Sequence, residues 1–206
     1  MFGNMGGASA FIAGGLVPLA TFAAPQPSTT DSPLVTRLKR AHAIVSSCSM
    51  VSLLISVMFS TMSSNKLRET VVSSTVSLKA LLVEGEFALP WLGCNAHFVF
   101  GLCGFAATVG LNAWLTYGGA VGRAVSCLVA SALLLMLSVV NDAVSTKMGE
   151  VSVGSTVLNL FSRYAALLLR SMVAGRRVLV LGAVTFAALG IALAAKALCD
   201  GCDGAE

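Results

Sequence analysis

Two rows of small polar residues, each containing one histidine, hold most of the chemistry that this sequence offers. Their members recur every three or four residues, so each row lies on one face of an α-helix. The first row, here named the serine stripe, is His42, Ser46, Ser49, Ser52, Ser56, Ser60 and Ser63. The second row, here named the glycine stripe, is Gly93, His97, Gly101, Gly104, Thr108 and Asn112. Polar groups within apolar segments are often functional, so both stripes are candidate sites.

Three roles fit the two stripes. Small residues allow membrane helices to approach closely, so the first role is helix packing, which we favour. The second role is to line a path for ions, protons or a small solute. Neither stripe contains an acidic residue, which a cation path usually has, and this weakens the second role. In the third role His97, His42 or Asn112 binds a cofactor such as haem or chlorophyll, because imidazole is a common metal ligand. A bound lipid is a further candidate.

A third polar group lies on the segment 151–173. Its polar residues share one helical face, while leucines and phenylalanine lie elsewhere on the helix. They are Ser152, Thr156, Asn159, Arg163 and Arg170. Inside a membrane Arg163, with Asn159 one turn before it, needs an acidic partner such as Asp142, Glu150 or a group of another subunit. In the alternative, Arg163 extends to the membrane surface from an interfacial helix.

Enzymatic motifs are missing from the sequence. It has no HExxH, GxSxG, phosphate loop or dinucleotide fingerprint, and no paired carboxylates at helical spacing in an apolar run. We therefore expect a protein that is not an enzyme. Four cysteines lie in apolar runs and are expected to act as small hydrophobes: Cys48, Cys94, Cys103 and Cys127. A single CxxC at Cys199 and Cys202 is a weak metal or redox signal.

Membrane-spanning helices must position these residues, because the composition excludes an ordinary soluble domain. Of 206 residues, 56% are hydrophobic and only 11% are charged, whereas soluble domains carry about 25% charged residues. A helix needs about 20 mostly apolar residues to cross a bilayer. We predict an all-α, polytopic bundle with four spans, at 41–62, 93–117, 124–140 and 178–198.

The segment 151–173 is predicted to be either a fifth, amphipathic span or an interfacial helix. The distribution of basic residues slightly favours five spans, since it then shows the bias expected from the positive-inside rule. One side would hold seven basic residues, Arg37, Lys39, Arg40, Arg123, Arg170, Arg176 and Arg177. The other side would hold five, Lys66, Arg68, Lys79, Lys147 and Lys196.

The remaining segments divide the chain into three parts. Residues 1–36 form an apolar, glycine-rich segment followed by a linker rich in Pro, Ser and Thr, residues 37–198 the transmembrane domain, and residues 199–206 a short acidic tail. Pro18 is expected to kink a helix, so the N-terminal segment is predicted to be interfacial or re-entrant, with a sixth span as the alternative.

The connections between the spans carry three further expectations. Residues 67–86 alternate apolar and charged residues, which predicts a surface helix outside the membrane. Trp91 lies where the second span begins, and tryptophan favours the membrane interface. Residues 141–150 are predicted to be a polar loop.

The function predicted from these features is a non-catalytic accessory subunit, held by its stripes in a larger membrane complex. The absence of an N-x-[ST] sequon and of a secretory signal favours an organelle membrane, thylakoid or mitochondrial inner. The expected partners are the lipid bilayer and other membrane subunits. Nucleic acid is not expected, because the basic residues lie singly or in short clusters beside apolar runs. The alternatives are a small oligomeric ion channel or transporter, and a pigment- or haem-binding subunit.

Overall fold

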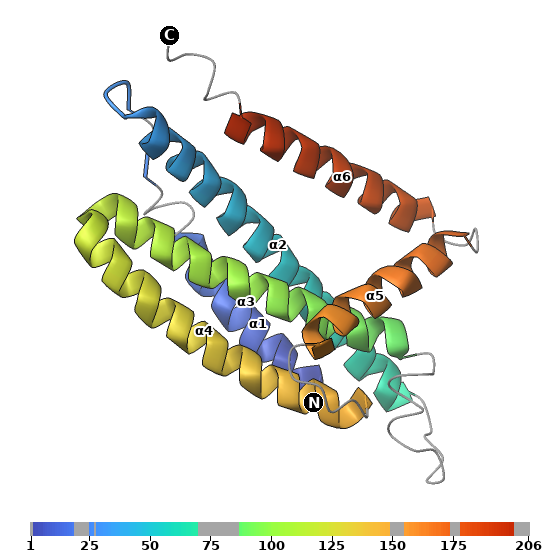
Figure 1. Cartoon of the computed structure of the whole chain (residues 1–206). Coiled ribbons are helices and arrows are strands. Elements are labelled where there is room, and N and C mark those ends of the chain that lie inside the picture. Colours follow the sequence, from blue (N-terminus) through green and yellow to red (C-terminus); the bar gives the residue numbers. More distant parts are fainter. Residues whose placement is uncertain are drawn as a thin grey trace.

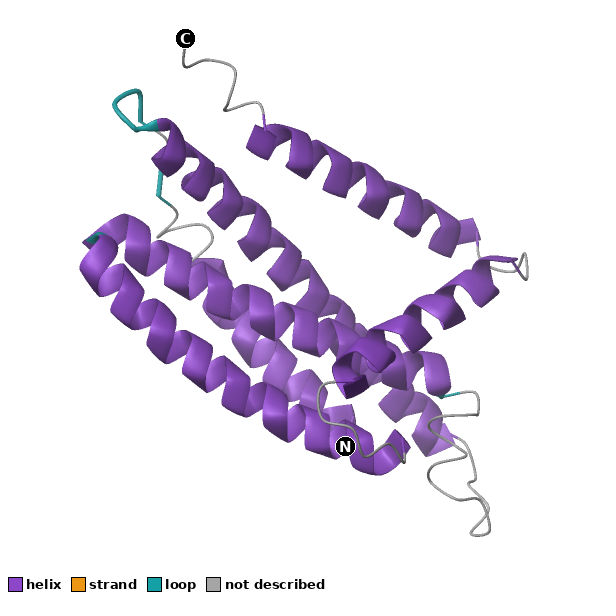
Figure 2. Ribbon diagram, in the orientation of Figure 1, coloured by secondary structure: helices purple, strands orange, loops and turns teal. Residues whose placement is uncertain are grey.

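Helices are the only regular secondary structure in the described part of the chain. The computed structural model describes residues 2–18, 25–26, 28–69, 87–148, 155–173 and 178–199. Its six helices are α1 (Phe2–Val17), α2 (Pro33–Glu69), α3 (Ala88–Tyr117), α4 (Gly119–Met148), α5 (Ser155–Val173) and α6 (Val178–Cys199). Figure 2 shows helices and no strand among the described residues. The predicted all-α class is confirmed.

Four of the helices are long and apolar enough to cross a membrane. The qualifying segments are Pro33–Arg68, Ala88–Tyr117, Gly119–Ser138 and Gly182–Cys199. Each contains or closely overlaps one of the four predicted spans, which confirms a multi-pass membrane protein. α1 has 16 residues, which is about 24 Å of helix, shorter than the hydrocarbon core of about 30 Å. It ends immediately before Pro18, the residue expected to disturb a helix there.

Helices α1 to α4 pack side by side with alternating directions (Figure 1). Near one end of the bundle Gly6 of α1 lies against Ser60 of α2. Farther along, Leu16 of α1 and Leu53 of α2 share an apolar cluster, so α1 runs antiparallel to α2. The same bundle places both stripes, which lie on α2 and α3, at its centre.

The sequence explains where α2 begins. Ser32 precedes the helix, and its hydroxyl oxygen accepts a hydrogen bond from the backbone N–H of Val35 at 3.4 Å. Pro33 follows at the first helical position, where a missing N–H costs nothing. α2 therefore begins within the predicted linker, which was expected to extend to residue 36.

A single glycine separates α3 from α4. Gly118 has a φ of +84°, a value that residues with a side chain rarely adopt, and its N–H donates to the carbonyl oxygen of Trp114 at 3.1 Å. α4 begins at the next residue, earlier than the predicted 124. So tight a connection makes α3 and α4 antiparallel neighbours. Gly122 lies on the contact, because a Cβ there would be 2.6 Å from Trp114 Cα.

The predicted polar loop at 141–150 is wrong for most of its length. α4 continues through Asn141 and ends at Met148. Between these two residues the sequence has neither glycine nor proline, and Gly149 is the first such residue. Polarity alone suggested a loop, whereas the absence of a helix breaker allows the last two turns of α4 to continue beyond the apolar span.

Helix α5 crosses the start of α3 obliquely and does not carry the chain from one end of the bundle to the other (Figure 1). A guanidinium nitrogen of Arg40 donates to the carbonyl oxygen of Ala197 at 2.8 Å, so α6 ends beside the start of α2. α4 ends at the opposite end of the bundle, so the chain passes back from that end to the start of α2 once, through α6. The spanning alternative for 151–173 was therefore wrong. The count of basic residues that favoured five spans placed Lys196 and Arg40 on different sides of the membrane, whereas both lie at the same end of the bundle.

Two apolar clusters hold the helices together. Phe87, which precedes α3, Trp91, Leu92 and Ala96 of α3, and Leu160 of α5 form one cluster. Ala13 and Leu16 of α1 and Leu53 of α2 form the other. Trp91 is completely buried, because α5 covers this end of α3. Its predicted depth at the membrane interface, at the start of the second span, stays a prediction. The predicted surface helix at 67–86 lies outside the described residues after Glu69, as do residues 200–206 of the acidic tail.

Candidate functional site

The serine stripe forms the buried face of α2. All seven members are at most 4% exposed: His42, Ser46, Ser49, Ser52, Ser56, Ser60 and Ser63. The opposite face of α2 is apolar and exposed, with Val51, Leu54, Met58 and Met62 at its surface. This is the reverse of a helix in a water-soluble protein, and it suits a helix with lipid on its outer side, where an unpaired hydroxyl group would be costly.

The glycine stripe of α3 packs directly on this face. A Cβ at Gly101 would lie 2.5 Å from Leu53 Cγ, and one at Gly104 would lie 2.7 Å from Ser49 Cβ. At Gly93 the Cβ would meet the ring of Phe59 at 2.7 Å. Real Cβ atoms do not approach so closely. The glycines are therefore required where they stand, because they let the two backbones come into contact.

Two hydroxyl groups of the serine stripe donate to carbonyl oxygens of α3. Ser49 Oγ donates to the carbonyl oxygen of Gly101 at 2.5 Å, and Ser56 Oγ donates to that of Cys94 at 3.0 Å. From α1, Ser9 Oγ donates to Ser56 Oγ at 3.0 Å. A hydroxyl proton used in this way ties two helices together and is not free to serve a moving ion. The contacts thus support packing as the role of the stripes.

His97 joins three helices through both of its ring nitrogens. Nδ1 lies 2.8 Å from the Ser52 hydroxyl of α2, and Nε2 lies 3.0 Å from the Tyr164 hydroxyl of α5. The ring of Phe59 stacks on the imidazole with centroids 6.2 Å apart, and the Tyr164 ring meets its edge at 5.4 Å. We name His97, Ser52, Tyr164 and Phe59 the His97 junction.

In the His97 junction both ring nitrogens of the imidazole have hydrogen-bond partners from this chain. A neutral imidazole has one donor nitrogen and one acceptor nitrogen, and a hydroxyl group can complement either. Binding a haem or chlorophyll metal through His97 would require one nitrogen to leave Ser52 or Tyr164. That exchange would leave a buried hydroxyl without its partner, at a cost of about 1–3 kcal/mol. The arrangement therefore favours a structural histidine over a metal ligand.

The structure does not bring the two histidines together. His42 and Ser52 are ten residues apart on α2, which corresponds to about 15 Å along the helix, and Ser52 is the residue that contacts His97. His42 is 1% exposed, and its Nε2 has no hydrogen-bond partner among the described residues. Asn112 Oδ1, on the glycine stripe, is also buried without one among those residues. Thr108, between Gly104 and Asn112, donates to the carbonyl oxygen of Gly104 at 2.8 Å.

The sequence analysis missed two residues of the His97 junction, Phe59 and Tyr164. Arg163 and Asn159 drew attention on α5 because they are polar, and both are half-buried there. Tyr164 follows Arg163 and lies one turn after the buried Leu160, on the side of α5 that packs on α3. A tyrosine on the apolar side of an amphipathic helix was the available signal, since a buried hydroxyl needs a partner. The proposed partners of Arg163, Asp142 and Glu150, lie outside the residues whose side chains are described.

The cysteines form neither a disulfide nor a metal cluster within the described part of the chain. Its five cysteines, Cys48, Cys94, Cys103, Cys127 and Cys199, are all unpaired. No group of three His, Cys, Asp or Glu residues is placed to hold a metal ion in the described ranges. Cys202, the second cysteine of the CxxC, lies outside the described residues.

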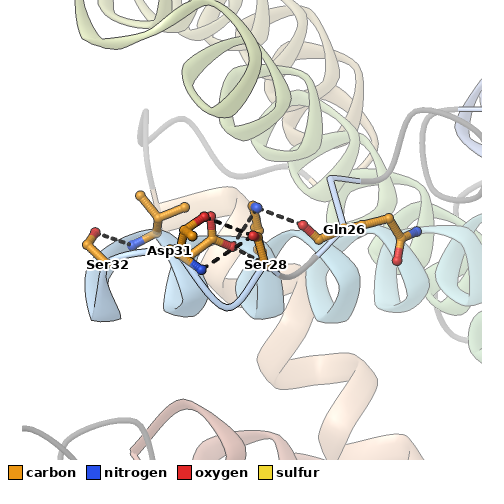
Figure 3. Close-up of polar contacts among 7 residues, drawn as sticks. Gln26, Ser28, Asp31 and Ser32 are labelled. Atoms are coloured by element: carbon orange, nitrogen blue, oxygen red, sulfur yellow. Dashed lines mark hydrogen bonds and ion pairs between the residues drawn. The ribbon is translucent and has the colours of Figure 1, made fainter.

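An ion pair fixes the segment before α2 to the surface of that helix. Lys39 Nζ donates to Asp31 Oδ2 and to the carbonyl oxygen of Gln26, both at 2.6 Å. The backbone N–H of Ser28 also donates to Asp31 Oδ2, and Figure 3 shows Gln26, Ser28 and Asp31 drawn together by these contacts. The Lys39 hydrogen bond, followed by that of Ser28, holds the pKa of Asp31 below its ordinary value of 3.8.

Comparison with known proteins finds no matching family, no similar curated protein and no similar solved structure.

Proposed function

We propose that this chain is a non-catalytic structural subunit of a larger assembly of membrane proteins. The observation that carries the proposal is that α6 is not buried in the chain. This helix is long and apolar enough to span a membrane, and yet none of its residues from 182 to 199 is buried within the chain. Phe186, Leu189 and Ile191 are each more than half exposed. A spanning helix of this kind can pack against another protein.

The residue pattern of α6 supports a protein partner over lipid alone. Ala183, Ala187, Gly190 and Ala194 recur at steps of four, three and four residues, which places them within about 60° of arc at 100° per residue. Small residues on one face allow a second helix to approach closely. A Cβ at Gly182 or at Gly190 would have no atom of another part of the chain within 4 Å of it. The small face is therefore open.

The two stripes on α2 and α3 do not provide the surface for such a partner. They were expected to hold the chain in its complex, but they pack on each other inside the bundle. A path between them in one chain would have to separate contacts such as Ser49 with Gly101 and Leu53 with Gly101. These contacts support a structural role for the stripes and give no support to the channel alternative.

A second outward surface lies on the other side of the bundle. An apolar groove of about 640 Å³ runs between α1, α3 and α4, and Ile12, Phe98, Phe105, Ala132 and Met136 are among its lining residues. Lipid chains or an apolar helix of a neighbouring subunit fit this surface. Partners on both sides of the bundle are what a subunit inside a larger assembly needs.

The proposal is tested by extracting the tagged chain from its native membrane with a mild detergent. Native electrophoresis with mass spectrometry is expected to find it in a complex much larger than one 21.1 kDa chain. Ala187→Phe, on the small face of α6, is expected to release the chain from that complex. Ala192→Phe, on the opposite face of α6, is the matched control and is expected to leave the complex intact.

Two results would contradict the proposal. One is migration of the wild-type chain only as a free monomer under the mildest extraction. The other is a complex that survives Ala187→Phe as well as it survives Ala192→Phe. The setting that we propose, a thylakoid or mitochondrial inner membrane, is tested separately by fractionating cells that express the tagged chain from its own promoter.

A further inference from the structure

Two buried polar atoms lie on facing helices at the end of the bundle where α2 begins. His42 Nε2 and Asn112 Oδ1 are both inaccessible to solvent, and neither has a hydrogen-bond partner among the described residues. Such atoms are rare in native proteins, because a buried polar group without a partner costs about 1–3 kcal/mol. In a membrane protein the lipid cannot replace the missing partner.

The register of α2 and α3 places the two residues at the same level. Ser49 of α2 and Gly104 of α3 are in contact at a distance that only glycine permits. His42 lies seven residues before Ser49, which is about 10.5 Å along α2, and Asn112 lies eight residues after Gly104, which is about 12 Å along α3. Because the helices are antiparallel, both distances lead in the same direction.

The two residues also share the interface between the helices. His42 and Ser49 are seven residues apart, and Asn112 and Gly101 are eleven apart, so each pair lies within about 20° on its helix at 100° per residue. Ser49 and Gly101 are hydrogen-bonded across the interface. The side of α2 that bears His42 and the side of α3 that bears Asn112 therefore face each other.

The chemistry of the pair is complementary to one water molecule. Nε2 of a neutral imidazole donates a hydrogen bond when it carries the proton, and the amide Oδ1 only accepts. A water molecule accepts from the first group and donates to the second. Buried waters in proteins typically bridge polar groups that would otherwise be unsatisfied, with two to four hydrogen bonds each.

We propose that a single buried water molecule binds between His42 and Asn112 and links α2 to α3. The site is independent of the proposed function. It adds a third kind of polar contact to the α2–α3 interface, after the serine hydroxyls and the His97 junction. It also explains why a histidine stands where the rest of the stripe has serine, since an imidazole reaches a water that a serine hydroxyl would not.

The chain offers an internal control for the test, because it has only two histidines. A sample labelled with ¹⁵N in histidine, in lipid nanodiscs, gives the signals of two imidazole rings. Magnetisation transfer from water is expected to reach the Nε2 proton of His42. No such transfer is expected at His97, whose nitrogens contact Ser52 and Tyr164.

Two substitutions on α3 assign the water to the pair. Asn112→Leu removes the acceptor and is expected to abolish or greatly weaken the water transfer at His42, with a change in the Nε2 shift. Thr108→Val is the matched control one turn away, because the Thr108 hydroxyl donates to its own helix. It is expected to leave the His42 signals unchanged.

The outcomes separate clearly. Water transfer at His42 that depends on Asn112 supports the proposal. A His42 imidazole without water transfer, including one bonded directly to Asn112, overturns it. So does water transfer that Asn112→Leu leaves unchanged. The His97 signals report whether each variant keeps its fold, and Asn112→Ser replaces Asn112→Leu where they change, with the same loss expected because the shorter side chain falls short of the water.

Discussion

The α2–α3 interface and helix α6 are built from similar residues, and yet they behave differently. Both contain apolar helices of membrane-spanning length with small residues on one face. On α3 the glycines meet the serine stripe of α2, and hydroxyl groups donate across the contact. On α6 the small face has no facing helix among the described residues, and no residue from 182 to 199 is buried.

The difference shows what small residues do in a membrane protein. A glycine permits close approach, but association also needs an opposing face with matching shape and hydrogen bonds, because lipid offers little hydrophobic drive between helices. α2 supplies that face to α3. For α6 we propose that the matching face belongs to another protein.

The largest difference in the free energy of unfolding is expected between glycine substitutions on α3 and on α6. Gly101→Val puts side-chain atoms into the position of Leu53, which lies 2.5 Å from a Cβ there. Overpacking of this kind is expected to lower the free energy of unfolding by about 1–3 kcal/mol or more. Gly190→Val on α6 meets nothing within 4 Å and is expected to change it by about 0.5 kcal/mol or less. Unfolding in mixed micelles by SDS titration measures both, and equal effects would remove the distinction between the two regions.

The next largest effect is expected at the His97 junction. His97→Phe keeps the ring but leaves the hydroxyl groups of Ser52 and Tyr164 without their partner, which should cost about 1–3 kcal/mol. A double-mutant cycle with Tyr164→Phe isolates the bond between α3 and α5 and should give a coupling energy of about 0.6–1.7 kcal/mol. A coupling energy of zero would mean that α5 is held by its apolar contacts alone.

A smaller effect is expected from a single hydroxyl of the serine stripe. Ser49→Ala removes the hydrogen bond to the carbonyl oxygen of Gly101 and should cost about 0.6–1.7 kcal/mol, the range of bonds between membrane helices. Ser47, two residues away, is exposed, so Ser47→Ala is the matched control, with about 0.5 kcal/mol or less expected. Thermal unfolding in one detergent compares the two, and a larger loss for Ser47→Ala would contradict the buried role of the stripe.

The smallest effect concerns the ion pair outside the membrane, and it depends on pH. Because Lys39 lowers the pKa of Asp31 in the folded chain, the pair stabilises the fold at pH values above 3.8. Its contribution is lost as the pH falls through the lower, folded pKa. Hydrogen exchange at the Ser28 amide is expected to accelerate over that acidic range. Asp31→Asn should exchange fast at every pH, and an exchange rate independent of pH in the wild type, after correction for intrinsic chemistry, would contradict the pair.

The sequence by itself determined the helical membrane class, the four spans and the membership of both stripes. These depend on composition and helical period, which are properties of a linear chain. The segment 178–198, for example, is apolar by composition, and this does not depend on which residues pack against it. The three-residue and four-residue steps of Ser46, Ser49 and Ser52 fall on one face in any helix.

Tertiary structure alone decided what those faces meet. The sequence did not show that α5 buries Trp91. It also left open whether 151–173 spans, which the contact between Arg40 and Ala197 decided. Tyr164 became part of the His97 junction only because an oblique helix carries it there. The physical reason is that periodicity fixes the direction of a side chain on its own helix, whereas its partner depends on how separate helices cross, to which residues far apart in the sequence contribute together.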